Sequence, residues 1–141
     1  MESYIHILLD LDDTVFDFPQ SEKIAFGKTM EKLGIDNVDS IRKIYTEENI
    51  KCWKQIEQKT LAREDMFWKR WANTFEVANI KVDTPFLEIN SIYITELSKL
   101  GICLPGAEDF LKELRALPSR TISLITNGTS QSANGRIKAS G

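Results

Sequence analysis

The sequence predicts an α/β fold in which a bundle of helices is inserted into a small parallel sheet. Tyr4–Leu9 is a short apolar run that ends in acidic residues, as is typical of a strand buried on both faces of a parallel sheet. A second strand of this kind is expected at Thr121–Thr126. Between the two, from Ser21 to about Leu100, apolar residues recur at helical spacing. This order indicates a Rossmann-type core, interrupted by a helical cap.

Four helices are expected in the insertion, followed by one more before the second strand. Ser21 is the expected N-terminal cap of the first helix, which ends at Leu33 before Gly34. The later helices are expected over Val38–Gln58, Arg63–Ala78, about Ile89–Leu100 and Ala107–Leu117. On the second helix Glu47, Glu48 and Lys51 lie mostly off the apolar stripe. The stripes suit a small antiparallel bundle.

Composition excludes several classes of function. The 141 residues are 42% hydrophobic and 28% charged, in the range of a soluble domain with a core. A net charge of −3 leaves no basic surplus for binding a nucleic acid polymer. Cys52 and Cys103 are expected to be buried free thiols, and no export or membrane segment is visible. A cytoplasmic location is expected.

Acidic residues follow the first expected strand directly, as Asp10-Leu11-Asp12-Asp13-Thr14. Ligands of open α/β sheets bind just outside the carboxyl ends of strands. Alternation along the chain sends the side chains of Asp10 and Asp12 the same way, and their charges would repel without a cation. Magnesium is the natural cation beside a phosphate. The alternative without a catalytic role is that these acids cap a turn or lie solvated at the strand end.

The run Asp10-Leu11-Asp12-Asp13-Thr14-Val15 behind an apolar strand resembles the first signature motif of the haloacid dehalogenase-like superfamily. The resemblance implies that Asp10 is the nucleophile that becomes an aspartyl-phosphate, and that Asp12 is the general acid and base. It also implies that Mg²⁺ is bound by the carboxylate of Asp10 and the main-chain carbonyl of Asp12. A second acid favours phosphoryl transfer over dehalogenation, because an alkoxide leaving group needs a proton.

Thr126-Asn127-Gly128 closes the second expected strand and resembles the second motif of the same superfamily. The resemblance implies that the Thr126 hydroxyl and the Asn127 N–H hold the phosphoryl group, while Gly128 allows close approach. Taken alone, this sequence is more often an Asn-Gly turn. The joint appearance of both motifs, in order and separated by a block of cap size, favours the superfamily. The implied domains are residues 1–18 and 102–141 for a partial core, and 19–101 for the cap.

Within the cap, the stretch Asn49–Glu57, with Arg63, Phe67 and Arg70, is similar to pyrimidine 5'-nucleotidases. The similarity implies a small phosphorylated metabolite as partner and suggests Asn49, Trp53 and Arg70 as substrate contacts. The alternatives are a bundle-core role for Trp53, and solvated helix faces for Asn49 and Arg70.

The chain also departs from the superfamily's pattern. No acidic residue follows Glu113, so the late acidic motif is missing, and no convincing catalytic lysine follows Thr126. Arg136 and Lys138 are expected to be solvated residues of a polar terminal helix or tail. A two-stranded parallel sheet leaves its edges open. We therefore expect a fragment, a truncated product or a chain that borrows strands from a partner copy, with impaired activity. The rival function is a non-catalytic binding or interaction protein.

Overall fold

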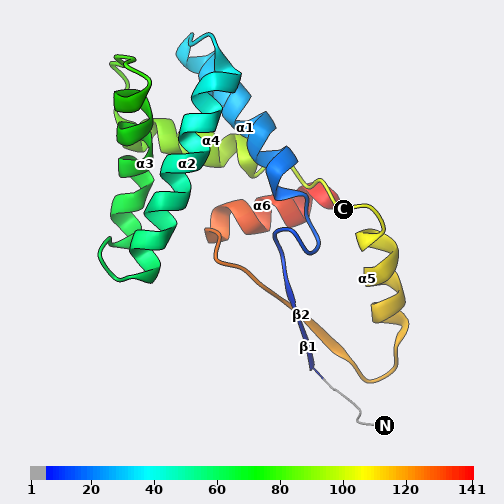
Figure 1. The fold of residues 1–141 in the computed structure, drawn as a ribbon. Helices are drawn as coiled ribbons and strands as arrows, with labels where there is room; N and C mark the ends of the chain where they lie inside the picture. The colour runs from blue at the N-terminus through cyan, green and yellow to red at the C-terminus, as the bar shows by residue number, and fades with distance from the viewer. Residues whose placement is uncertain (1–5) are drawn as a thin grey trace. The chain divides into compact units, whose positions relative to one another are not determined.

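The structure is a computed structural model that describes residues 6–141. It contains a two-stranded sheet and six helices among these residues (Figure 1). The elements along the chain are β1 (His6–Asp10), α1 (Phe18–Leu33), α2 (Val38–Glu57), α3 (Arg63–Val77), α4 (Phe86–Leu97), α5 (Ala107–Ala116), β2 (Thr121–Ile125) and α6 (Ser130–Ser140). Each predicted helix and both predicted strands are present, although Tyr4 and Ile5 of the first strand lie outside the described residues.

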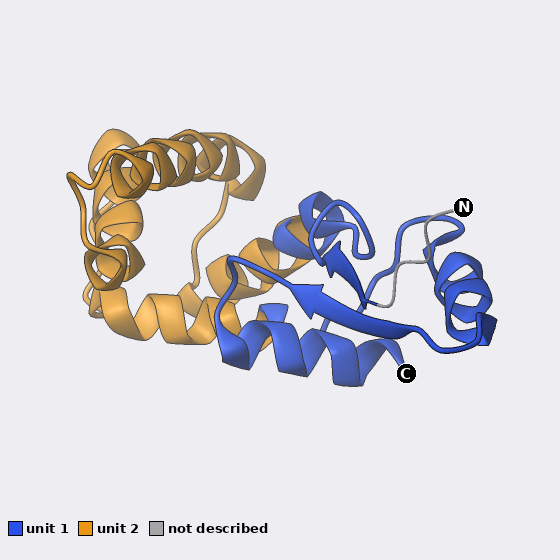
Figure 2. Ribbon diagram, turned by 90° about the horizontal axis from the view of Figure 1, so that it is seen from below, with its two compact units in different colours: residues 1–22, 97–141 blue, residues 23–96 orange. Residues whose placement is uncertain are grey.

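The chain divides into two compact units, shown in different colours in Figure 2. Unit 1 comprises residues 1–22 and 97–141, and unit 2 comprises residues 23–96. The first unit contains the sheet, and the second contains the main part of the inserted helices. The predicted domain boundaries after residues 18 and 101 remain a prediction.

Unit 2 is built on a cluster of buried aromatic rings. The ring of Trp71 is fully buried, and its centroid lies 4.6 Å from that of Tyr45, 5.5 Å from Tyr93 and 5.9 Å from Phe26. These rings come from all four helices of the insertion, so each apolar stripe meets the others at one place. Aromatic pairs at these separations add to the stabilisation from burial alone.

Helix α1 begins earlier than predicted, and a different residue caps it. The carboxylate of Asp17 accepts a hydrogen bond from the N–H of Gln20 at 3.0 Å, which is the contact of an N-terminal cap. Ser21 lies inside the helix, where its hydroxyl donates to the carbonyl of Asp17. The predicted end is confirmed: Gly34 has a φ of 65°, and the N–H of Ile35 donates to the carbonyl of Met30.

The prediction that Glu48 lies mostly off the apolar stripe of α2 is wrong, because its side chain is buried. Its two carboxylate oxygens accept from the ammonium of Lys51 and from the amide of Asn73 on α3 at 3.1 Å. A buried carboxylate is tolerated where its oxygens are hydrogen-bonded. Helical periodicity alone does not reveal such a partnered acid.

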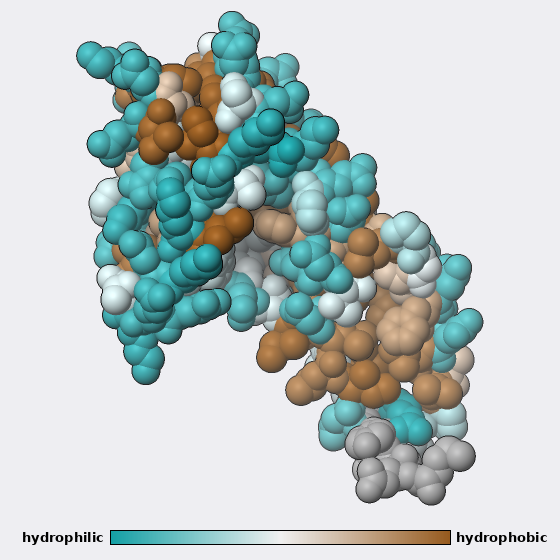
Figure 3. Space-filling view, viewed as in Figure 1, coloured by the Kyte–Doolittle hydropathy of each residue, from teal (hydrophilic) through white to brown (hydrophobic). Residues whose placement is uncertain are grey.

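In unit 1 the two strands run parallel, with His6 paired to Thr121 and Asp10 paired to Ile125. The expectation that both faces of the strands are buried is wrong for this chain. The side chains of Leu8 and Ile125 are 67% and 57% exposed, and residues alternate between exposed and half-buried along β1. Two strands without a covering layer leave one face open. Apolar side chains gather on the surface over this part of unit 1 (Figure 3).

The other principal contacts of unit 1 hold the loop after β1. Leu11, Val15, Phe16 and Ala133 form a buried cluster, and Cys103 and Leu111 pack against it. The segment at Phe16 pairs antiparallel with Cys103, where the N–H of Asp17 donates to the carbonyl of Ile102 at 2.9 Å. Apolar contact and backbone pairing therefore fix the loop that carries the acidic motif.

Both cysteines are free, as predicted: Cys52 is buried and Cys103 half-buried. Burial raises the pKa of both thiols. Within residues 6–141, none of the helices is both long enough and apolar enough to cross a bilayer.

Candidate active site

The acidic motif lies in a tight loop at the carboxyl end of β1. The carbonyl of Leu11 accepts hydrogen bonds from the N–H groups of Val15 and Phe16, at 3.0 and 2.9 Å. Asp13 has a φ of 58°, a left-handed conformation that Asp tolerates better than most residues. Asp10 is exposed, and its carboxylate accepts from the N–H of Leu11 at 3.0 Å. The loop thus turns the chain while leaving the first carboxylate accessible.

The second motif lies between β2 and α6. The Thr126 hydroxyl accepts from the N–H of Gly128 at 3.0 Å, and a hydroxyl that accepts one bond still has its own hydrogen to donate. A Cβ at Gly128 would lie 3.2 Å from that hydroxyl, which is a tight contact. Thr129 caps α6 by accepting from the N–H of Ser132. The motif therefore ends at a helix N-terminus, where backbone N–H groups and the helix dipole favour anions.

The pairing of the strands brings the two motifs to the same end of the sheet. The N–H of Leu11, between Asp10 and Asp12, donates to the carbonyl of Ile125 at 3.2 Å. Ile125 directly precedes Thr126, so the acids and the hydroxyl emerge from neighbouring strands. Residues that are more than 110 positions apart in sequence thereby meet at one edge. Their catalytic and phosphate-binding roles remain predictions.

Arg136 is the residue that the sequence reasoning missed. The sequence predicts a solvated side chain, but Arg136 is 1% exposed, and its Nη1 donates to the carboxylate of Asp12 at 2.5 Å. Its guanidinium also lies over the rings of Phe16 and Phe18, 4.9 and 5.5 Å from their centroids. Ser132, Ala133 and Arg136 fall on one face of α6, and that face is buried in the structure. Lys138 is exposed, as expected.

The oxygen atoms of the acidic loop fit a magnesium ion in part. Mg²⁺ is commonly held by one or two protein oxygens, with water and phosphate oxygens completing six ligands. The carboxylate of Asp10 and the main-chain carbonyl of Asp12 are suitable oxygens, whereas the carboxylate of Asp12 is engaged by Arg136. No group of three or more acidic, His or Cys side chains that could hold a metal occurs among residues 6–141.

The three suggested substrate contacts lie in unit 2, and the structure joins two of them. Nη1 of Arg70 donates to the side-chain oxygen of Asn49 at 3.1 Å, and its Nη2 donates to that of Asn90. Arg70 is 5% exposed, and its guanidinium lies 5.3 Å from the ring centroid of Tyr93. These contacts link α2, α3 and α4 and so supply a structural role. Trp53 is half-buried, with the guanidinium of Arg63 over its ring at 5.8 Å.

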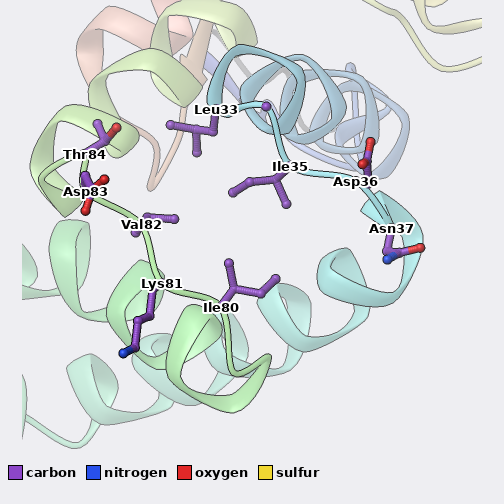
Figure 4. Close-up of a pocket in the computed structure, with 10 residues that line it drawn as sticks. Leu33, Ile35, Asp36, Asn37, Ile80, Lys81, Val82, Asp83 and Thr84 are labelled. Atoms are coloured by element: carbon purple, nitrogen blue, oxygen red, sulfur yellow. The ribbon is translucent and has the colours of Figure 1, made fainter.

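A hollow of about 510 Å³ lies within unit 2, between the loops that follow α1 and α3 (Figure 4). Ile35 and Ile80 point into it, whereas Lys81 points away. Its lining, residues 33–37 and 80–84, includes none of the predicted site residues. We therefore do not assign the predicted phosphoryl transfer to this hollow.

No family model matches the chain, but individual proteins do. It is 29% identical over 140 residues to the pyrimidine 5'-nucleotidase PynA of Streptococcus pneumoniae, covering 98% of this chain and 57% of that protein. It is 25% identical over 141 residues to the putative HAD-hydrolase YfnB of Bacillus subtilis, covering 100% of this chain and 58% of that protein. The chain thus spans less than three fifths of the length of these relatives.

A solved structure shows the same fold. The crystal structure of YfnB bound to magnesium matches with a TM-score of 0.90 and 22% identity, over 99% of this chain and 59% of that one. The agreement covers both the sheet and the inserted helices, so the predicted haloacid dehalogenase-like core with a helical cap is confirmed. In fold the chain matches the HAD-hydrolase YfnB, and in sequence it resembles the pyrimidine 5'-nucleotidase PynA as well as YfnB.

Proposed function

We propose that this chain carries the phosphoryl-accepting part of a magnesium-dependent phosphate monoester hydrolase. The observation that carries the proposal is the strand register, which brings Asp10 and Thr126 to one end of the sheet. A carboxylate nucleophile beside a hydroxyl donor and a helix N-terminus is suited to receiving a phosphoryl group. Similarity to PynA and YfnB supports hydrolysis as the reaction class.

The reaction divides into two displacements at phosphorus. An oxygen of Asp10 forms a bond to phosphorus as the bond to the leaving alcohol breaks, and Asp12 gives that alcohol its proton. Asp12 then takes a proton from water, whose oxygen attacks phosphorus and releases Asp10 and inorganic phosphate. The Thr126 hydroxyl and the Asn127 N–H hold the phosphoryl oxygens in both steps. Magnesium, held by Asp10 and the Asp12 carbonyl, would supply positive charge beside those oxygens.

Binding of a phosphoryl mimic tests the proposal without requiring turnover. The measurement is the melting temperature with Mg²⁺ and beryllium fluoride, which together imitate an aspartyl-phosphate. We expect stabilisation of about 2.7 kcal/mol at a ligand concentration one hundred times the dissociation constant. The control is Asp10→Asn, which keeps the shape of the side chain and should abolish the shift. An unchanged melting temperature in the original chain, or equal shifts in both, would contradict the proposal.

A hydrolysis assay distinguishes the proposed enzyme from the rival function, a non-catalytic binding protein. Hydrolysis of a generic aryl phosphate by residues 1–141 with Mg²⁺ should be slow, because no acid follows Glu113 within them and only Arg136 and Lys138 are basic after Thr126. It should nevertheless exceed the rate of Asp10→Asn. Binding of the mimic together with equal background rates in both proteins would favour the non-catalytic function.

For the substrate we propose a nucleoside monophosphate, on the strength of the similarity to PynA and of the residues Asn49 and Trp53 in the cap. Trp53 is half-buried, with the guanidinium of Arg63 over its ring, and a tryptophan ring is suited to stacking on a base. Uridine monophosphate with Mg²⁺ should raise the melting temperature more than ribose 5-phosphate does. Trp53→Ala should remove that difference, whereas Trp68→Ala, which removes a 40% exposed tryptophan from the same unit, should retain it. Equal effects of the two phosphates in the original chain would exclude base recognition.

A further inference from the structure

Arg136 occupies a site in unit 1 that is shaped around its guanidinium. The side chain is fully buried, with the rings of Phe16 and Phe18 against its plane and Asp12 at Nη1. Its Nε donates to the carbonyl of Leu100 at 3.4 Å. A buried guanidinium is costly unless a charge and hydrogen bonds compensate for lost water, and Asp12 supplies that charge.

Two glycines make this arrangement possible. A Cβ at Gly101 would lie 2.5 Å from the carbonyl oxygen of Arg136 and 2.3 Å from the backbone nitrogen of Ser140. A Cβ at Gly135 would lie 2.6 Å from the carbonyl oxygen of Ser98. Real Cβ atoms do not approach backbone so closely, so α6 packs against residues 98–101 only because both positions lack side chains. This close packing brings Arg136 to the loop after β1.

The hydrogen bonds of Arg136 do not use all of its donors. Nη2 is buried and has no hydrogen-bond partner among residues 6–141, although Nη1 contacts Asp12. An unsatisfied buried donor reduces stability and calls for an explanation. The guanidinium therefore meets Asp12 through Nη1 and the Leu100 carbonyl through Nε, while Nη2 is left without a partner among the described residues.

The contact has a specific consequence for Asp12. A carboxylate has two oxygens, and Arg136 binds Oδ1, which restricts rotation of the side chain. The Asp12 side chain is 30% exposed, so it is also accessible from solvent. One side of the carboxylate is thus anchored in the protein while the side chain remains in reach of a substrate.

We propose that Arg136 is the positioning residue for Asp12, holding its carboxylate in the orientation from which it exchanges a proton with the substrate. This inference rests on the proposed function, in which Asp12 is the general acid and base. It gives α6 a second role besides the proposed anion site at its N-terminus, because the position of this helix sets the orientation of an acid in the loop after β1. Catalytic groups need such support, since small errors in geometry reduce rates strongly.

The test measures the side-chain rotamer of Asp12 by NMR, from its χ1 couplings and carboxylate ¹³C shift, with and without Mg²⁺ and beryllium fluoride. We expect one rotamer in the original chain, averaged rotamers in Arg136→Met and one rotamer again in Arg136→Lys, which restores the cation. The matched control is Arg115→Met, which makes the same change on the exposed surface of unit 1. An arginine that merely fastens α6 would leave Asp12 in one rotamer in Arg136→Met, and that result would overturn the inference.

A second variant covers the case in which Arg136→Met does not fold. Asp12→Asn should shift the Nε–H signal of Arg136 in the folded protein, whereas Asp13→Asn, at an exposed neighbour, should not. Equal spectra of Arg136 in both variants would overturn the inference by this route. Failure of the proposed function looks different: the original chain would bind no beryllium fluoride, whatever the rotamer of Asp12.

Discussion

At the scale of single residues, the close packing of α6 makes a prediction about Gly101. Gly101→Ala should destabilise the chain by about 1–3 kcal/mol, because the new Cβ would overlap the backbone of Arg136 and Ser140. Gly27→Ala is the matched control: a Cβ there meets nothing within 4 Å inside α1, and alanine should stabilise the helix by roughly 0.5–1 kcal/mol. The measurement is urea unfolding followed by circular dichroism. Similar effects of the two substitutions would contradict the close crossing of α6 and residues 98–101.

Residues differ in how far the sequence alone could predict their positions. Asp10 and Thr126 each follow a short apolar strand, and parallel strands have their carboxyl ends at one edge, so their meeting could be predicted. The burial of Arg136 could not, since it depends on contacts of α6 with Gly101 and with the ring of Phe16. Arg70 illustrates the same limit, because its partners Asn49 and Asn90 come from two other helices.

At the scale of elements, two residues are candidates for the N-terminal cap of α1, namely Asp17 and Ser21. Asp17→Ala should cost about 1 kcal/mol of stability, because the N–H of Gln20 loses its acceptor. Asp17→Asn should cost clearly less, since asparagine is as good a cap as aspartate. Both effects are measured by thermal unfolding. If the two substitutions were equally costly, the cap would not be what Asp17 contributes.

Helix ends are harder to predict than helix interiors for a physical reason. The interiors follow from apolar spacing, so the stripe through Ile41, Tyr45 and Cys52 is buried as expected. A cap depends on which side chain happens to reach an N–H group, and both Asp17 and Ser21 have suitable chemistry. Gly34 is easier, because a left-handed residue at a helix end is strongly biased to glycine.

At the scale of the whole molecule, the described residues form a sheet of two strands with exposed apolar side chains. Strand sequences predict burial on both faces, yet Leu8 and Ile125 face solvent, because two strands provide no covering layer. The apolar pattern of a strand shows that its side chains are suited to burial on both faces. It does not show whether other elements cover those faces.

The exposed face leads to a prediction about association between copies of the chain. Open strand edges and an uncovered apolar face favour pairing with another molecule. Leu8→Lys should therefore lower the average mass measured by analytical ultracentrifugation at high protein concentration, because it places a charge on the open face of β1. Leu87→Lys is the matched control, since that leucine is 59% exposed on α4 in the other unit. Equal sedimentation of the original chain and both variants would show that the open sheet does not drive association, whereas a loss confined to Leu8→Lys would identify it as the contact surface.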